Sequence, residues 1–329
     1  MKKILIIGTG GTIASEQTAD GLAPGLSTEQ LLHAIPSISE LCDVDCTQVF
    51  SLDSTNVRPG HWLILADTIR KYYEEYDGFV ITHGTDTMAY TAAGLSYLIQ
   101  NSRKPIVLTG AQKPIGEEGT DAKRNITDAL RYACDENSHY VVIVFSGSVI
   151  CGTRARKNYS KRFMAFESIN FPVLADIRDG RIIRYVPETA EGETRFYDYL
   201  NPNVGLLKLT PGINNNVMHY ALAMYNGLVI ESFGVGGLPE YSDYYQQIRE
   251  AVENGKLIVM TTQVQNEGSD LSLYRVGSIL KSSMNVLEAH DMTSEAVLGK
   301  LMWILGLTDD FHRAEELFYR PVHHDILYM

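Results

Sequence analysis

The chain has 329 residues, of which 45% are hydrophobic, and its 28 Lys and Arg residues are outnumbered by 40 Asp and Glu residues. This length predicts about two domains, each long enough to bury its own core. The net charge of −12, counted with neutral histidines, argues against nucleic acid as the main ligand, because phosphate backbones repel an acidic surface.

Cysteine usage and hydropathy indicate where the protein resides. The four cysteines are too few for a disulfide framework, and we expect free thiols in a reducing compartment. The apolar run 4–7 is shorter than the ~7–15 residues of a signal peptide's apolar region. No stretch approaches the ~18 apolar residues of a membrane span, so the sequence predicts a cytoplasmic protein with no membrane partner.

Short β-branched runs alternate with amphipathic stretches in the first half of the chain. We expect strands at 4–7, 78–82, 105–108 and 140–145, and helices at 59–76, 85–99 and 123–134. The run 4–7 is apolar on both faces, as in a buried parallel strand. This alternation predicts a parallel sheet with helices on both faces.

The pattern changes after residue 175. A β-hairpin is expected at 176–186 with its turn at Asp179 and Gly180, and the acidic segment 187–202 is typical of an interdomain connection. A second alternation has strands at 204–209, 227–231 and 256–261 and helices at 215–225, 242–253 and 294–305. We therefore predict an α/β protein with an N-terminal domain at 1–186, a linker at 187–202 and a smaller C-terminal domain at 203–329.

Three polar clusters follow expected strand ends, at 9–12, 83–87 and 109–112. In parallel sheets, ligands bind beyond the carboxyl ends of the strands. Glycines beside hydroxyl and acidic side chains allow close backbone approach and supply oriented hydrogen-bonding groups. These clusters favour a site for a small polar ligand.

Common catalytic and cofactor motifs are missing. The third glycine of a dinucleotide fingerprint is replaced by Ile13, and no P-loop, zincin or nucleophile-elbow motif occurs. The remaining candidates are threonines, which need an activating partner to act as nucleophiles. Thr85, Asp86 and Lys157 could supply a hydroxyl, a carboxylate and an amine, although Lys157 by itself is more typical of a solvated basic loop.

Five segments resemble the signatures of one family when they are taken together. They read TGGTIA at 9–14, DGFVITHGTDTM at 77–88, TGAQKP at 109–114, GTRARK at 152–157 and DMTSEA at 291–296. In this order they resemble the bacterial-type L-asparaginases, over essentially the whole chain. The short N-terminus and the segment 163–166 resemble the cytoplasmic, type I branch.

The resemblance implies a larger flavodoxin-like N-terminal domain and a smaller C-terminal α/β domain. It also implies hydrolysis of L-asparagine to L-aspartate and ammonia through an acyl-enzyme on threonine, with minor glutaminase activity and with no cofactor or metal. The family assembles as homodimers or homotetramers, and we expect the same here.

The family's site residues transfer by motif. Thr12 matches the nucleophile, and Thr85, Asp86 and Lys157 match a second cluster that activates water or the nucleophile and holds substrate. The implied substrate-binding residues are Ser54, Thr55, Gly84 and Ala111. A neighbouring carboxylate favours a charged amine, whereas a base must be neutral, so the sequence leaves open whether Lys157 takes the proton of Thr12 or acts electrostatically.

Two departures from the family pattern stand out. The tyrosine that often closes over the nucleophile is replaced by Leu22, and Tyr274 is one candidate to serve instead. The Arg and Cys of a regulatory asparagine site found in some type I enzymes are replaced by Glu231 and Val264. We therefore expect no such allosteric site, or a rebuilt one.

Two alternatives remain. One is a glutamine-preferring enzyme or a transamidation subunit, which ranks lower because such a subunit usually carries an extra N-terminal domain. The other is a non-catalytic amino-acid-binding or nucleotide-binding module, which has no need for Thr12, Thr85, Asp86 and Lys157 together. The preference between asparagine and glutamine depends on one methylene and cannot be derived from the sequence.

Overall fold

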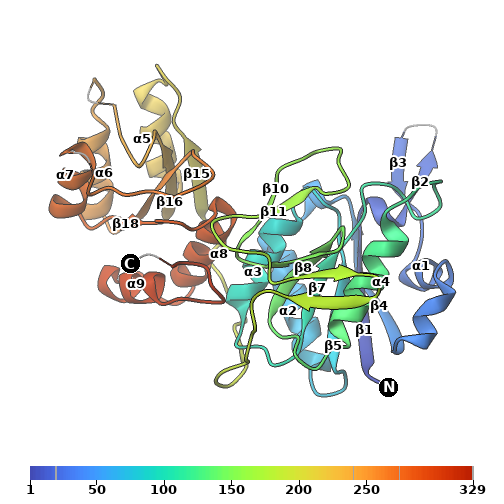
Figure 1. Ribbon diagram of the computed structural model, residues 1–329. Coiled ribbons are helices and arrows are strands. Elements are labelled where there is room, and N and C mark those ends of the chain that lie inside the picture. Colours follow the sequence, from blue (N-terminus) through green and yellow to red (C-terminus); the bar gives the residue numbers. More distant parts are fainter. Residues whose placement is uncertain (19–20, 240, 274, 328–329) are drawn as a thin grey trace. The chain divides into compact units, whose positions relative to one another are not determined.

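The computed structural model describes residues 1–18, 21–239, 241–273 and 275–327. The chain divides into two compact units, 1–198 and 199–329, each built around its own sheet (Figure 1). The first sheet is mostly parallel and larger, and the second is smaller and parallel. This arrangement confirms the predicted α/β fold class.

The first unit contains an eight-stranded sheet. Its strands in spatial order are β13 (Arg181–Arg184), β12 (Ala175–Arg178), β9 (Ser148–Cys151), β8 (Val141–Phe145), β7 (Ile106–Thr109), β5 (Gly78–Thr82), β1 (Lys3–Gly10) and β4 (Asp43–Leu52). The five strands from β8 to β4 are parallel, whereas β9, β12 and β13 continue the sheet in antiparallel order. The four carboxyl ends of β4, β1, β5 and β7 consequently lie next to one another.

Helices cover both faces of this sheet, so its central strands are buried on both sides. One core contains Ile4, Ile6 and Val80 together with residues of α1 (Thr28–His33) and α4 (Ala122–Ala133). The alternate residues Leu5, Phe79 and Ile81 are also fully or nearly fully buried. On the sheet face formed by these alternate residues, α2 (Pro59–Tyr72) and α3 (Met88–Leu98) pack against each other, and α3 packs on β7 and β8.

Shorter elements complete the first unit. The two-stranded pairs are β2 (Ser15–Thr18) with β3 (Gly21–Pro24), β10 (Ala155–Lys157) with β11 (Phe166–Ser168), and β6 (Ile99–Gln100) with β14 (Arg195–Phe196). Single 3-10 turns form η1 (Thr12–Ala14), η2 (Pro36–Glu40) and η3 (Ser54–Asn56). The η1 and η3 turns directly follow β1 and β4.

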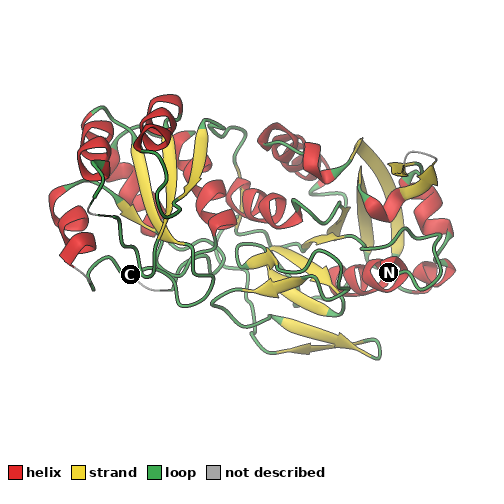
Figure 2. Cartoon of the chain, turned by 90° about the horizontal axis from the view of Figure 1, so that it is seen from above, coloured by secondary structure: helices red, strands yellow, loops and turns green. Residues whose placement is uncertain are grey.

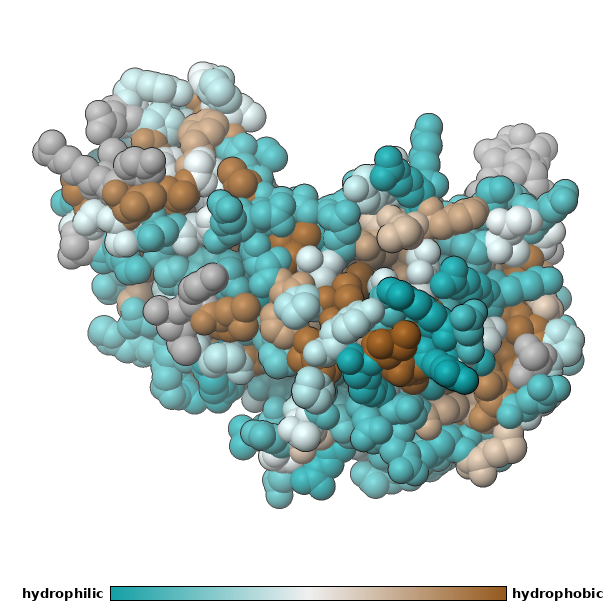
Figure 3. Space-filling model, in the orientation of Figure 1, coloured by the Kyte–Doolittle hydropathy of each residue, from teal (hydrophilic) through white to brown (hydrophobic). Residues whose placement is uncertain are grey.

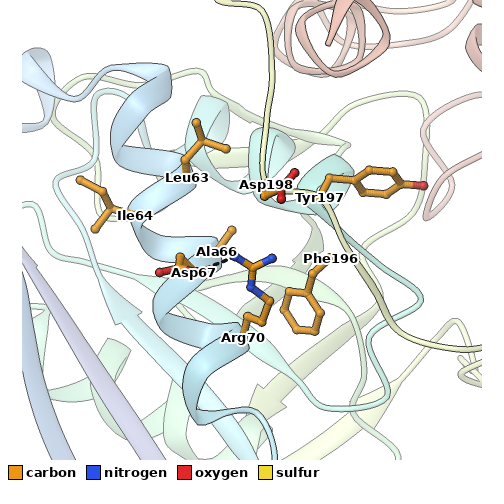
Figure 4. A pocket seen from close by; sticks show the side chains of 8 residues that line it. All are labelled: Leu63, Ile64, Ala66, Asp67, Arg70, Phe196, Tyr197 and Asp198. Carbon is orange, nitrogen blue, oxygen red and sulfur yellow. Dashed lines mark hydrogen bonds and ion pairs between the residues drawn. The ribbon is translucent and has the colours of Figure 1, made fainter. Parts of the chain in front are cut away.

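The segment 187–198, which the sequence suggested as part of a linker, is part of the first unit. Its β14 pairs with β6 in antiparallel register, and Tyr197 N–H donates to the carbonyl of Leu98. Residues 196–198 also form one wall of a surface pocket of about 340 Å³ against α2 (Figure 4). The lining residues are Leu63, Ile64, Ala66, Asp67, Arg70, Phe196, Tyr197 and Asp198. The polar composition of this segment thus reflects a surface position on the first unit.

The second unit has a four-stranded parallel sheet with helices packed around it (Figure 2). Its strands in order are β15 (Val204–Lys208), β16 (Gly227–Ser232), β17 (Leu257–Thr262) and β18 (Leu287–Glu288). Its helices are α5 (Asn215–Met224), α6 (Tyr244–Glu253), α7 (Arg275–Ser283), α8 (Ser294–Leu305) and α9 (Phe311–Tyr319). Helices α5 and α6 share one core with Leu228, Ile230 and Ile258, while α8 packs on β15 and β16.

The C-terminal segment of the second unit is fixed by a buried ion pair. The ammonium of Lys300 on α8 lies 2.7 Å from the carboxylate of Asp325, and both side chains are fully buried. The same ammonium donates to the carbonyl of Arg320 at 3.0 Å. Opposite charges in a dry interior are tolerated only when they are paired in this way.

The surface is mainly polar. Hydrophilic residues cover most of the face drawn in Figure 3, with apolar residues scattered among them. Among the described residues, no helix has the length and apolarity that a membrane crossing requires.

Candidate active site

Four turns meet at the carboxyl edge of the first sheet. They follow β4, β1, β5 and β7, which are neighbours in that order. All three polar clusters noted in the sequence belong to this group, and the turn after β4 adds Ser54 and Thr55. Parallel sheets bind ligands at this edge, beside the helix and loop starts.

Glycines allow these turns to approach each other through their main chains. A Cβ atom on Gly11 would lie 2.4 Å from the nitrogen of Gly84, and one on Gly84 would lie 2.7 Å from Cβ of Ser54. A Cβ atom on Gly110 would lie 2.2 Å from the carbonyl oxygen of His83. Such distances leave no room for a side chain at these glycines, so the turns after β1, β5 and β7 meet through main-chain atoms, and Gly84 packs against the side chain of Ser54.

Thr12 begins η1, immediately after Gly11, and its side chain is half-buried. Gly11 has φ +81°, a conformation that glycine adopts at little cost. The turn is held by a hydrogen bond from Ala14 N–H to the carbonyl of Gly11, at 3.1 Å. Thr12 therefore stands on a turn whose backbone lies against the turn that carries Thr85.

Lys157 joins this edge from β10 and contacts two of the predicted residues. Its Nζ atom lies 2.7 Å from Oγ1 of Thr85 and 2.6 Å from Oδ1 of Asp86. The lysine side chain is 14% exposed, whereas that of Asp86 is 57% exposed. The structure thus brings together an ammonium, a hydroxyl and an accessible carboxylate, as the motifs suggested.

The turn after β4 contributes two residues in different settings. Ser54 is buried, and its Oγ accepts a hydrogen bond from Asp86 N–H at 3.3 Å while its carbonyl accepts one from Thr87. Thr55 is exposed, and both its hydroxyl and its N–H donate to Oδ1 of Asp53 at 2.8 Å. The hydroxyl of Ser54 can therefore donate to a ligand, whereas that of Thr55 is engaged by Asp53.

The turn after β7 contains Ala111, which is buried, and Gln112, which contacts the lysine cluster. Oγ1 of Thr85 donates to Oε1 of Gln112 at 3.3 Å. The backbone of this turn is fixed by Asp121, whose carboxylate accepts from the N–H groups of Gln112 and Lys113. Neither Gln112 nor Asp121 was given a role from the sequence. The position of Gln112 in a polar cluster after a strand was the only signal for it.

His83 begins the turn that follows β5, and its side chain is completely buried. Its Nδ1 lies 2.7 Å from the carbonyl oxygen of Gly84, and its Nε2 lies 3.0 Å from Oγ1 of Thr91. The indole N–H of Trp62 donates to the same Thr91 oxygen. Burial lowers the pKa of His83 from 6.5 to about 4, so the imidazole is neutral near neutral pH.

The two departures from the family pattern involve residues of different units. Leu22 lies in β3, and Tyr274 falls outside the described residues. In the second unit, Glu231 is buried at the end of β16, and its Oε1 accepts a hydrogen bond from Ser294 at 2.6 Å. Lid closure and the absence of an allosteric site stay predictions.

The fold and the edge geometry define an α/β protein of two units with a polar cluster at the sheet edge of the larger unit. Comparison with known proteins is more specific. The family model "Asparaginase, N-terminal" matches residues 3–189, and "Glutaminase/Asparaginase C-terminal domain" matches residues 203–318. The chain therefore belongs to the asparaginase family of hydrolases, which confirms the resemblance inferred from the motifs.

Individual relatives agree with this assignment. The chain is 37% identical to an L-asparaginase of Thermococcus kodakarensis, over 97% of this chain and 98% of that protein. It is 34% identical to a subunit of the glutamyl-tRNA(Gln) amidotransferase of Pyrococcus furiosus, over 95% of this chain and 74% of that protein.

Solved structures show the same similarity. The thermostable L-asparaginase from Thermococcus kodakarensis superimposes with a TM-score of 0.92 at 36% identity, covering 99% of this chain and 100% of that chain. L-asparaginase I from Vibrio cholerae gives a TM-score of 0.89 at 29% identity, covering 99% of both chains.

Proposed function

We propose that this enzyme hydrolyses L-asparagine to L-aspartate and ammonia through an acyl-enzyme on Thr12. The observation that carries the proposal is the contact of Lys157 with both Thr85 and Asp86, on a turn packed main chain to main chain against that of Thr12. A module that only binds amino acids has no need for a second hydroxyl paired with an ammonium beside the first.

The charged groups of asparagine match groups of the site. The exposed carboxylate of Asp86 can pair with the α-ammonium of asparagine. The hydroxyl of Ser54 can donate to the α-carboxylate, and the exposed Thr55 can join it if its hydroxyl turns from Asp53. In this arrangement the side-chain amide points toward the turns of Thr12, Gly84 and Ala111.

The reaction then proceeds in two steps. The Thr12 oxygen attacks the carboxamide carbon, its proton passes to the leaving nitrogen, and ammonia departs from the tetrahedral intermediate. Water then attacks the resulting ester, releasing aspartate and restoring the Thr12 hydroxyl. Backbone N–H groups of the glycine-rich turns stabilise the oxyanion, a contribution of about 3 kcal/mol per donor in other enzymes.

The contacts of Lys157 bear on its role in these steps. The amine lies 2.6 Å from the Asp86 carboxylate, in a charge-assisted hydrogen bond that the amine donates. This arrangement supports the electrostatic role for Lys157, in which it orients Thr85 and stabilises developing negative charge. A base role would require the lysine to lose its proton when substrate binds.

Release of ammonia from asparagine and from glutamine tests the proposal directly. We expect turnover of asparagine by the unaltered chain, with minor turnover of glutamine, and a loss of at least ~1,000-fold in kcat for Thr12→Ala. Thr127→Ala serves as a matched control, because Thr127 lies on α4 and its hydroxyl donates to Lys123 of the same helix. Undiminished turnover by Thr12→Ala contradicts the assignment of Thr12 as nucleophile.

The same assay separates the related alternative. The Pyrococcus furiosus relative is a subunit of a glutamyl-tRNA(Gln) amidotransferase. A rate with glutamine that exceeds the rate with asparagine would favour a glutamine-hydrolysing subunit over an asparaginase.

We also propose a cytoplasmic homodimer or homotetramer. The family resemblance supports the assembly, and the four cysteines, all free, are consistent with a reducing compartment. Light scattering on the purified protein should give two or four times the chain mass of 36.7 kDa. A monomer would contradict the proposed assembly.

A further inference from the structure

We propose that Gln112 is a positioning residue that accepts the hydroxyl proton of Thr85 and thereby holds the Thr85 oxygen in place for Lys157. This inference rests on the proposed function, since it concerns how the lysine cluster is prepared for catalysis. It is carried by three contacts that link Lys157, Thr85, Gln112 and the main chain at Arg162.

The orientation of the Gln112 amide follows from its second partner. Its Nε2 atom lies 2.9 Å from the carbonyl oxygen of Arg162. A carbonyl oxygen can only accept hydrogen bonds, so the amide NH₂ must face it. The amide oxygen Oε1 is then the atom that faces Thr85, at 3.3 Å.

This orientation fixes the direction of the Thr85 hydroxyl. A hydroxyl has one proton to donate and two lone pairs that accept. Because Oε1 of Gln112 cannot donate, the single proton of Thr85 points toward Gln112. The lone pairs of the Thr85 oxygen are thereby available to the Nζ–H groups of Lys157, 2.7 Å away.

Gln112 also connects two segments that carry different parts of the cluster. Its main chain is fixed on the β7 turn by Asp121, which accepts from the N–H groups of Gln112 and Lys113. Its side chain reaches Arg162, in the connection between β10 and β11, and β10 ends at Lys157. One side chain therefore links the connection that follows the lysine strand to the hydroxyl of Thr85.

Replacing Gln112 distinguishes a positioning role from a purely structural one, because loss of a purely structural residue would lower the melting temperature. The residue is half-buried at the edge of the sheet and lies outside the hydrophobic cores of both units, so a side chain of similar length should retain the fold. Methionine has that length, and it lacks the N–H donor and the amide oxygen. Gln112→Met thus removes the hydrogen bonds with little change in packing.

Steady-state kinetics with asparagine should show the loss in kcat. We expect kcat of Gln112→Met to fall about tenfold, with KM changed less than about twofold and with the melting temperature unchanged within ~2 °C. Gln246→Met is the matched control, because Gln246 lies on the exposed face of α6 and bonds to Glu250. A fall in melting temperature, or a rise in KM at constant kcat, would overturn the positioning role.

A double-mutant cycle tests whether Gln112 acts through Thr85. In a Thr85→Ala background, which removes the hydroxyl, adding Gln112→Met should change the residual kcat less than about twofold. The same tenfold loss in both backgrounds would show that Gln112 acts by another route, and would overturn the proposal.

Crystal structures separate this inference from the proposed function. In Gln112→Met the Thr85 oxygen and the connection after Lys157 both lose their contact with residue 112, and we expect the distance between Oγ1 of Thr85 and Nζ of Lys157 to exceed ~3.5 Å. An unchanged distance overturns the positioning role, whatever the chain's substrate proves to be. Retained activity in Thr12→Ala overturns the proposed mechanism and leaves this measurement intact.

Discussion

Acidification should destabilise the first unit through one buried histidine. His83 lies in a directional chain in which Trp62 donates to Thr91, the Thr91 hydroxyl donates to Nε2 of His83, and Nδ1–H donates to Gly84. A second proton, on Nε2, would have to be accepted by the Thr91 oxygen, and the Thr91 hydroxyl proton would then lose its acceptor on the imidazole. Burial and this hydrogen-bond pattern both favour a neutral imidazole, in agreement with its lowered pKa of about 4.

The size of this effect follows from linkage. Between the ordinary pKa of 6.5 and the lowered pKa of about 4, the unfolded chain binds a proton that the folded chain rejects, so stability falls as the pH falls. Stability contributed by neutral His83 is complete above pH ~6.5 and lost below pH ~4. At about 1.4 kcal/mol per pH unit the full loss is roughly 3 kcal/mol, of which about 2 kcal/mol falls between pH ~7 and ~5.

Urea unfolding of the unaltered chain and of His83→Gln, at a series of pH values, measures this contribution. Other titrating groups cancel in the difference between the two free energies of unfolding, because glutamine does not titrate. We expect that difference to shrink by about 2 kcal/mol from pH ~7 to ~5. A difference that stays constant within ~0.5 kcal/mol would refute the preference of the folded chain for a neutral histidine.

Three further predictions concern other parts of the chain. Gly11→Ala should reduce kcat at least ~100-fold and lower the melting temperature, because its Cβ would lie 2.4 Å from the main chain of Gly84; activity within tenfold of the unaltered chain would contradict this packing. Asp325→Asn should cost about 3–5 kcal/mol in urea unfolding, since it removes the counter-charge that the buried ammonium of Lys300 faces, and a loss below ~1 kcal/mol would show that water reaches the pair. Initial rates against asparagine concentration should be hyperbolic, because the family resemblance predicts a regulatory arginine where this chain has Glu231, and Glu231 is bonded within its own unit; a sigmoidal curve would reveal a rebuilt regulatory site.

Elements with a strong apolar pattern were predictable from the sequence. The strand at 78–82 has the predicted bounds, and the hairpin turn at Asp179 and Gly180 has positive φ at both residues, as its composition indicates. Strand β4 was not predicted, because it is an edge strand whose residues alternate between exposed and half-buried and include few aliphatic side chains. The two-residue strand β14 is too short to produce a pattern.

The sequence predicted which residues lie at the site better than it predicted the hydrogen bonds between them. Hydroxyl, acidic and glycine residues after consecutive strands indicated that Thr12, Thr85 and Asp86 lie at one edge, since parallel strands end on the same side. The bond between Gln112 and Arg162 joins residues 50 positions apart, so no local pattern signals it. The engagement of the Thr55 hydroxyl by a nearby carboxylate likewise depends on the rotamers that the turn adopts.

The contacts between glycine main chains have a consequence for how this enzyme can change. Backbone geometry at a handful of small residues fixes the reactive groups, and this leaves surrounding side chains free to diverge. Such an arrangement is consistent with a TM-score of 0.92 to a structure that shares only 36% of its residues. Directed evolution toward new amide substrates would accordingly hold the small turn residues constant and diversify the side chains that border the bound molecule.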